Sequence, residues 1–293
     1  MTWSAAVPGA ALLAAVGYGV LHSRTAIPAG HPAYLVWLIA VALLGAGLLV
    51  WAFAGKQPAR GPVRAVLRWA AAAFAVGLAA VTAWLAPYEA TTIPEVPSRS
   101  SATGILLPAA DPQDTGVAFI PGALVDPRAY KNILEPLVAA GYPVYIAKPA
   151  FGVAFAVPDV VADAEAAAPG VEQWVVAGHS LGGAVASGQT DGAAGLILLG
   201  AYPIDDVSDT GVPVLSISGT DDALTTPADV AGSKQELPPD AQFVVIEGGV
   251  HAFFGDYGEQ RGDGQPTTSR EVAQERTQEA MLAFLRELPP AAP

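Results

Sequence analysis

The sequence has no cysteine, and its first 88 residues contain no Asp or Glu. Without cysteine there is no thiol nucleophile, no cysteine-ligated metal and no disulfide, and the redox compartment stays open. Residues 1–88 carry five Lys and Arg side chains, a formal charge of +5, whereas the remaining chain carries all 27 acids and nine bases, a formal charge of −18. Because an acidic domain repels phosphate, this composition argues against nucleic-acid binding.

Three uncharged apolar runs lie within the first 88 residues, at residues 3–21, 33–54 and 69–86. Each approaches the roughly 20 residues that a helix needs to cross a bilayer. The alternative, buried core helices of a soluble protein, fits poorly with 88 residues that lack any acid. No Lys or Arg precedes the first run, so it lacks the basic start of a signal peptide and is interpreted as a retained span. The sequence therefore predicts a transmembrane region over residues 1–88.

The basic residues between these runs predict how the region crosses the membrane. The loop before the third run, with the residues that flank it, contains Lys56, Arg60, Arg64 and Arg68, whereas the loop before the second run contains only Arg24. The positive-inside rule places the more basic loop in the cytoplasm. Three spans then leave everything after Tyr88 outside, so we expect a multi-pass protein of the cell membrane with an extracytoplasmic C-terminal domain.

Residues 89–101 are rich in proline and small polar residues, and they are interpreted as a linker without helix or strand. From residue 102 to residue 293, short apolar runs alternate with helical patterns. Strands are expected at residues 104–107, 116–120, 144–147, 174–177, 195–199, 214–218 and 243–246, and helices at 128–140, 158–168 and 269–288. This alternation predicts an α/β fold with a doubly wound, mostly parallel sheet. Residues 200–213 are too few for a cap domain, so substrate selection is expected from residues 151–157 and 202–210.

An apolar run leads into Gly178-His-Ser180-Leu-Gly182, which has the pattern of a nucleophile elbow. In this turn a strand passes directly into a helix and exposes a strained serine, and small residues two positions away on either side let strand and helix approach. An idle serine in a glycine-rich turn is the alternative. The first N–H of the helix, that of Leu181, would face a developing oxyanion. A Pro-Gly turn after the strand at 116–120 predicts the N–H of Ala123 as a second donor, unless it is an ordinary strand-ending turn.

A nucleophilic serine needs a base and a group that orients the base. Of the four histidines, two lie beside the apolar runs and His179 lies within the elbow, so His251 remains as the base. The acid is expected after the strand between serine and histidine, where Asp221 and Asp222 compete. We prefer Asp222 and interpret Asp221 as a neighbour that is solvated or supports the site without contacting the histidine.

The segment after His251 allows two interpretations. Its aromatic residues pack beneath the candidate triad, which is the interpretation we favour, or Asp256 or Tyr257 lines the substrate pocket. Asp256, Glu259 and Asp263 offer carboxylates to a hard cation, but they lack the spacing of an EF-hand loop. We therefore expect neither a metal nor an organic cofactor.

Five segments of residues 102–290 together resemble one known family. They are Pro121–Tyr130, Gly141–Tyr145, Gly178–Gly183, Gly219–Pro227 and Ile246–Gly258, the last followed by Gln260, Gly262 and Asp263. The domain resembles the α/β-hydrolases, and more narrowly the α/β hydrolase fold-5 family near the dienelactone-hydrolase-like enzymes. The resemblance implies Ser180, Asp222 and His251 as the catalytic triad. It implies no particular substrate.

The sequence thus predicts a membrane-anchored serine hydrolase that cleaves an ester, lactone or related acyl compound, with a small-molecule or lipid acyl substrate as its partner. Two other functions use the same residues: an acyltransferase that passes the acyl group to a lipid or glycan, and a non-catalytic binding or sensor module on a hydrolase frame. The oligomeric state does not follow from the sequence.

Overall fold

The computed structural model describes residues 3–54 and 61–291, and the chain forms two compact units. The first unit, the helical unit, comprises Met1–Pro28 and Pro32–Tyr88, and the second, the α/β unit, comprises Ala29–His31 and Glu89–Pro293. Each unit has its own architecture.

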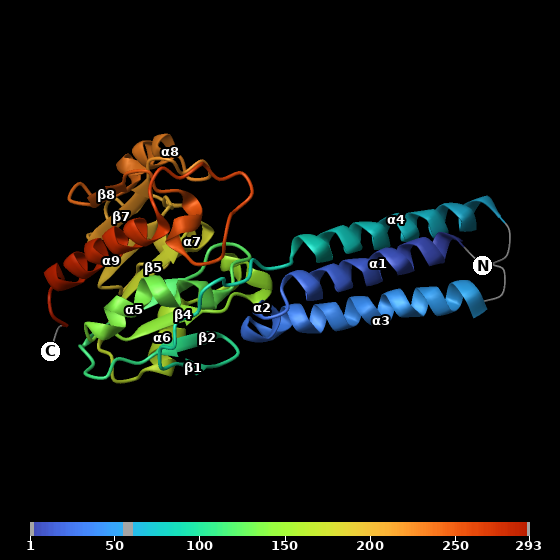
Figure 1. Ribbon diagram of the computed structural model, residues 1–293, viewed down its shortest axis with the longest axis horizontal. Helices are drawn as coiled ribbons and strands as arrows, with labels where there is room; N and C mark the ends of the chain where they lie inside the picture. The colour runs from blue at the N-terminus through green and yellow to red at the C-terminus, as the bar shows by residue number, and fades with distance from the viewer. Residues whose placement is uncertain (1–2, 55–60, 292–293) are drawn as a thin grey trace. The chain divides into compact units, whose positions relative to one another are not determined.

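The helical unit contains α1 (Trp3–His22), α3 (Pro32–Ala54) and α4 (Pro62–Trp84), with the single turn α2 (Ala26–Ala29) after α1 (Figure 1). All three long helices are long and apolar enough to cross a membrane. The third was expected at residues 69–86, but α4 begins seven residues earlier and therefore includes Arg64 and Arg68. The uncharged run marked only the apolar part of the helix, whereas Pro62 at its first turn supplies a favoured helix start.

The long helices meet through small residues. A Cβ atom added at Gly9 of α1 would lie 2.9 Å from the backbone oxygen of Gly45 in α3, so the two backbones approach closely. Between α3 and α4, Trp37 Nε1 donates a hydrogen bond to Thr82 Oγ1 at 3.1 Å. Large apolar side chains point away from the bundle, and Phe74 is 73% exposed.

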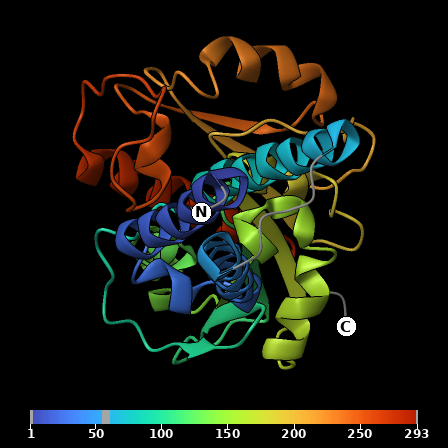
Figure 2. The ribbon, with the colours of Figure 1, turned by 90° about the vertical axis from the view of Figure 1, so that its right-hand side faces the viewer.

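The α/β unit contains an eight-stranded sheet (Figures 1 and 2). The strands are β1 (Arg99–Ser100), β2 (Gly104–Leu107), β3 (Thr115–Ile120), β4 (Val144–Ala147), β5 (Gln173–His179), β6 (Gly195–Leu199), β7 (Val214–Gly219) and β8 (Gln242–Ile246). Their order is β1-β2-β4-β3-β5-β6-β7-β8, and β1 and β2 are antiparallel to their neighbours while all other pairs are parallel. The expected mostly parallel sheet is confirmed.

Helices cover both faces of this sheet. They are α5 (Lys131–Ala139), α6 (Val160–Ala167), α7 (Leu181–Ser187), α8 (Pro227–Gly232) and α9 (Arg270–Glu287), with 3-10 turns η1 (Pro127–Tyr130), η2 (Ala150–Gly152), η3 (Ala154–Ala156), η4 (Ser233–Glu236) and η5 (His251–Phe254). Side chains of α6 and α7 pack with alternate strand residues in one core cluster. Helices α5 and α9 pack together on the other face (Figure 1). Residues 200–213 form no helix or strand, as expected of a fold without a cap domain.

The expectation that residues 89–101 contain no strand is wrong. Arg99 and Ser100 form β1, which pairs antiparallel with Leu106 and Ile105 of β2. A two-residue edge strand needs no propensity of its own, because the exposed edge of β2 supplies its hydrogen-bond partners. The start of this segment is also tied down, since Thr91 N donates to the backbone oxygen of Asp256 at 2.7 Å.

Candidate active site

Ser180 occupies the turn between β5 and α7 with φ 54° and ψ −127°, a strained backbone for a residue with a side chain. The turn is so tight that a Cβ atom at Gly178 would lie 2.4 Å from the backbone of Gly182. A Cβ at Gly182 would lie 2.1 Å from the backbone oxygen of Ile120 at the end of β3. The two glycines therefore let the elbow form against the neighbouring strand, as the sequence pattern predicted.

Asp222 and His251 meet at the carboxyl edge of the sheet, after β7 and β8. Asp222 Oδ2 lies 2.8 Å from His251 Nδ1, and both residues are almost completely buried. Asp222 Oδ1 accepts the N–H groups of Leu224 at 2.9 Å and Thr225 at 2.7 Å, which hold the carboxylate in place. His251 Nε2 makes no hydrogen bond to any described residue. A proton held on Nδ1 by the carboxylate leaves the Nε2 lone pair available as a base.

The neighbouring Asp221 has a different set of contacts. Its Oδ2 accepts the hydroxyl of Thr267 at 2.7 Å, and its backbone N–H donates to Gly249 O at 3.0 Å. The two adjacent aspartates therefore make different contacts. Asp221 joins its own loop to the segments of Gly249 and Thr267, and Asp222 contacts His251.

A second carboxylate holds the backbone of the histidine segment. Asp263 accepts the N–H of His251 at 3.2 Å and of Ala252 at 2.8 Å. Arg270, at the start of α9, donates to the backbone oxygens of Ala252 and Gly255. Asp263 is therefore already engaged by backbone donors, and no group of three or more metal-ligating side chains occurs among the described residues.

His179, the residue before Ser180, links the elbow to the loop after β3. Its Nδ1 lies 2.9 Å from the hydroxyl of Tyr130, which also accepts the N–H of Gly122 at 2.9 Å. Its ring stacks at a tilt on that of His251, with centroids 4.5 Å apart. Burial, reinforced by the nearby His251, holds the pKa of His179 well below its usual range, and burial raises the pKa of Tyr130. Both side chains are therefore neutral at neutral pH.

The sequence excludes His179 as the base because it lies within the elbow, but it does not predict this link to Tyr130. The histidine is visible in the elbow motif, but its partner Tyr130 lies 49 residues earlier, and no local pattern connects the two.

The two backbone donors expected for an oxyanion lie beside this link. Leu181 is the first residue of α7, and Ala123 follows Gly122 in the loop after β3. Neither N–H donates a hydrogen bond within the described chain. The N–H of Gly122 is hydrogen-bonded to Tyr130, so the N–H of Ala123, the next residue of the loop, is available to a ligand.

Strain is concentrated in the loops around this site. Within residues 3–54 and 61–291, the non-glycine residues with positive φ are Leu124, Phe151 and Ser180. The first two belong to adjoining loops, since Leu124 N donates to the oxygen of Gly152 at 2.8 Å. Strained residues of this kind persist only where the surrounding structure holds them, and they are frequent at functional sites.

A pocket of about 270 Å³ opens at Ser180. Its lining residues are Ser180, Leu181, Ala184, Ala201, Tyr202, Ile204, Leu224 and Thr225. Tyr202 and Ile204 come from one of the two loops expected to select the substrate, and the pocket is lined mainly by apolar side chains. Asp256 and Tyr257 are buried outside this lining, and the Tyr257 ring lies 6.1 Å from that of His179. The contact of Tyr257 with His179 supports the favoured interpretation, in which the aromatic residues of this segment pack under the candidate triad.

Comparisons with known proteins agree with this architecture. The profile of the alpha/beta hydrolase family matches residues 116–275, more than half of the chain. The chain therefore belongs to the α/β-hydrolase family, as its motifs predicted, and its α/β unit, which contains the matched residues, is the hydrolase unit. A search of the curated proteins found no match.

Solved structures with a similar fold include three hydrolase-type proteins. An esterase from Thermogutta terrifontis is 17% identical with a TM-score of 0.47, over 66% of this chain and 92% of the esterase. Est1E from Butyrivibrio proteoclasticus is 17% identical with a TM-score of 0.46, over 65% and 98% of the two chains. A serine hydrolase homologue from Coxiella burnetii is 13% identical with a TM-score of 0.47, over 68% and 99%.

Proposed function

We propose that this protein is a serine hydrolase that cleaves an ester, lactone or related acyl compound. The observation that carries the proposal is the buried Asp222–His251 pair at 2.8 Å, in a chain whose Ser180 is held in a strained elbow. Ser180 directly follows His179 in the chain, and the His179 ring lies against that of His251, so serine and base belong to one cluster.

In the proposed reaction, His251 Nε2 takes the hydroxyl proton of Ser180 while Ser180 Oγ attacks the substrate carbonyl. The resulting oxyanion accepts the N–H groups of Leu181 and Ala123, and each such donor is commonly worth about 3 kcal/mol. His251 then returns the proton to the leaving alcohol, and an acyl-enzyme remains on Ser180. Water repeats the sequence: His251 takes its proton, the acid is released, and Ser180 regains its hydrogen.

Asp222 has an electrostatic task in this scheme. Its carboxylate keeps the proton of the neutral imidazole on Nδ1 and stabilises the imidazolium that forms during attack. The buried position of Asp222 strengthens this interaction, because charges interact more strongly away from water. The apolar pocket at Ser180 would take the acyl portion of the substrate.

Fluorophosphonate labelling of the purified full-length protein in detergent tests the proposal. We expect wild type to be labelled, Ser180→Ala and His251→Ala not to be labelled, and His22→Ala, a histidine of the helical unit, to be labelled as wild type. An ester and lactone panel would then define the substrate, and product analysis with an acceptor present would detect acyl transfer. Folded wild type that takes no label would reject the proposal.

We further propose that α1, α3 and α4 cross the cell membrane and that the hydrolase unit lies outside the cytoplasm. Support comes from the length and composition of the helices, their exposed apolar side chains and the positive charge between the second and third spans. Carbonate extraction should leave the protein in the membrane fraction. A C-terminal reporter active only outside the cytoplasm should be active, and activity of a cytoplasm-only reporter would reverse the orientation.

A further inference from the structure

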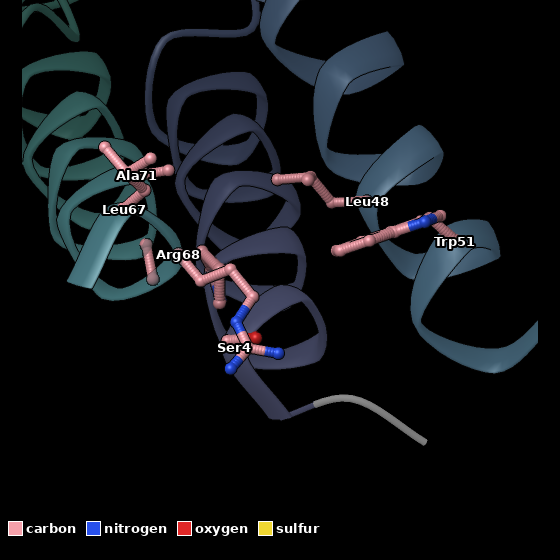
Figure 3. Close-up of a pocket in the computed structure, with 8 residues that line it drawn as sticks. Ser4, Leu48, Trp51, Leu67, Arg68 and Ala71 are labelled. Atoms are coloured by element: carbon pink, nitrogen blue, oxygen red, sulfur yellow. The ribbon is translucent and has the colours of Figure 1, made fainter. Parts of the chain in front are cut away.

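The helical unit contains a pocket that has no part in the proposed hydrolysis (Figure 3). It has a volume of about 250 Å³ and is lined by Ser4, Pro8, Leu48, Trp51, Leu67, Arg68, Ala71 and Ala72. These residues come from all three long helices. Ser4 is in the first turn of α1, Trp51 in the last turn of α3 and Arg68 in the second turn of α4, so the pocket lies at one end of the bundle.

Among the described residues of this lining, Arg68 is the only charged one. Its Nε is buried and makes no hydrogen bond to any described residue. A buried donor on a charged group that lacks a partner is more costly than a neutral one, because the charged group loses a stronger interaction with water. A guanidinium also presents its donors in a planar fork that matches the oxygens of a phosphate or carboxylate. An anion with such oxygens would therefore satisfy the guanidinium donors of Arg68.

The helical unit cannot supply that anion, because residues 1–88 contain no Asp or Glu. Among the described lining residues, Ser4 is also polar, but it is uncharged and offers one hydroxyl (Figure 3). A carboxylate or phosphate that neutralises Arg68 would therefore come from outside residues 1–88.

We infer that this pocket binds a phospholipid, with the phosphate on the Arg68 guanidinium and an acyl chain along the apolar lining. The inference rests on the proposed membrane crossing. In a spanning α4, Arg68 lies about 9 Å along the helix from Pro62, near the depth of the headgroups. Trp51 in the same lining is a residue type that favours this interface. The proposed orientation places this end at the cytoplasmic leaflet, where anionic lipids are concentrated.

The test measures lipid binding by native mass spectrometry on the full-length protein in detergent. The probes are a phosphatidylglycerol, a diacylglycerol with the same chains, and inorganic phosphate. Wild type should bind phosphatidylglycerol about tenfold more tightly than the phosphate-free diacylglycerol, the size expected for one charge-assisted contact. Arg68→Gln should remove that difference. Inorganic phosphate alone should not compete, because it lacks the chain that fills the lining.

Two further variants make the result specific. Arg64→Gln removes an exposed arginine one turn earlier on α4, outside the lining, and should bind as wild type does. Ala71→Trp keeps Arg68 but fills the lining from an exposed position, and should weaken phosphatidylglycerol binding about tenfold. If Arg68→Gln does not fold, Ala71→Trp decides the question.

Three results would overturn the inference: equal binding by Arg68→Gln and Arg64→Gln, unchanged binding by Ala71→Trp, or competition by inorganic phosphate alone. Failure of the membrane crossing would appear separately, as release of the protein on carbonate extraction. Fluorophosphonate labelling of the same variants checks that the hydrolase unit is folded.

Discussion

The two units of this protein bury polar groups in opposite ways. In the hydrolase unit, Asp222 and Asp263 are held by backbone N–H groups at the carboxyl edge of the sheet. In the helical unit, few polar side chains lie inside, and Thr82 satisfies its hydroxyl within its own helix and accepts from Trp37. Arg68 is the exception, with a buried nitrogen that has no partner among the described residues.

In each unit, at least one buried side-chain nitrogen has no hydrogen-bond partner among the described residues. His251 Nε2 has no hydrogen-bond partner among them, and Nδ1 of the same ring is held by Asp222. A general base requires a free nitrogen on a ring that is oriented in this way. Arg68 Nε has no partner among the described residues, and residues 1–88 contain no Asp or Glu that could provide one. A buried nitrogen without a partner thus supports the proposed catalytic base in one unit and the proposed lipid site in the other.

The largest effect is expected from Asp222→Asn. The amide cannot hold Nδ1–H of His251 as the carboxylate does, so the rate of fluorophosphonate labelling should fall about 10⁴-fold. The matched Asp221→Asn, one residue away, should stay within about threefold, since its contact is to Thr267. Equal losses in the two variants would show that the loop rather than the Asp222–His251 pair governs reactivity.

Gly182→Ala tests the tight packing of the elbow in the hydrolase unit. The new Cβ would press on Ile120 O at 2.1 Å, where backbone cannot give way, so we expect a loss of about 3 kcal/mol or more in unfolding free energy. In Gly188→Ala the nearest atom is 3.6 Å away, and stability should be unchanged or slightly higher. Thermal unfolding followed through loss of labelling distinguishes them.

Gly45→Val makes the corresponding test in the helical unit. A side chain at Gly45 meets Gly9 O at 3.0 Å and should push α1 and α3 apart, at a cost of about 1–3 kcal/mol. Gly47→Val, with nothing within 4 Å, is the control and should have no effect. Helix loss measured by circular dichroism in detergent should occur at lower temperature only in Gly45→Val. A lower melting temperature in Gly47→Val as well would argue against close packing at Gly45.

The smallest effect is expected in the pH dependence of the free energy of unfolding. Because burial lowers the pKa of His179 in the folded protein, the unfolded state binds the extra proton first. The contribution of neutral His179 is complete above its unfolded pKa of about 6.5, and it is lost as the pH falls from there toward the folded value. The free energy of unfolding should therefore drop by up to about 1.4 kcal/mol per pH unit in this range.

His179→Gln removes the titrating group from that position. Its thermal unfolding temperature should change less between about pH 7 and pH 5 than that of wild type. An identical acid response in the two proteins would mean that other groups carry it.

Much of this arrangement follows from local sequence. The apolar runs predicted the three long helices, strand–helix alternation predicted the sheet, and the elbow motif located the strained serine, because periodicity and close glycine spacing are local properties. The linker strand at Arg99 and the early start of α4 at Pro62 were missed. The first depends on pairing with a distant strand, and the second on a helix continuing through charged residues.

Composition alone separates an acid-free apolar segment from an acidic α/β domain, and chain order points to Ser180 and His251 with Asp222 preferred over Asp221. The folded chain was needed to show that Asp222 contacts His251, that His179 reaches Tyr130, and that Arg68 lines a pocket between three helices. The reason is geometric. Side-chain contacts between residues tens of positions apart depend on how separate elements pack, and no periodicity within one element encodes that packing.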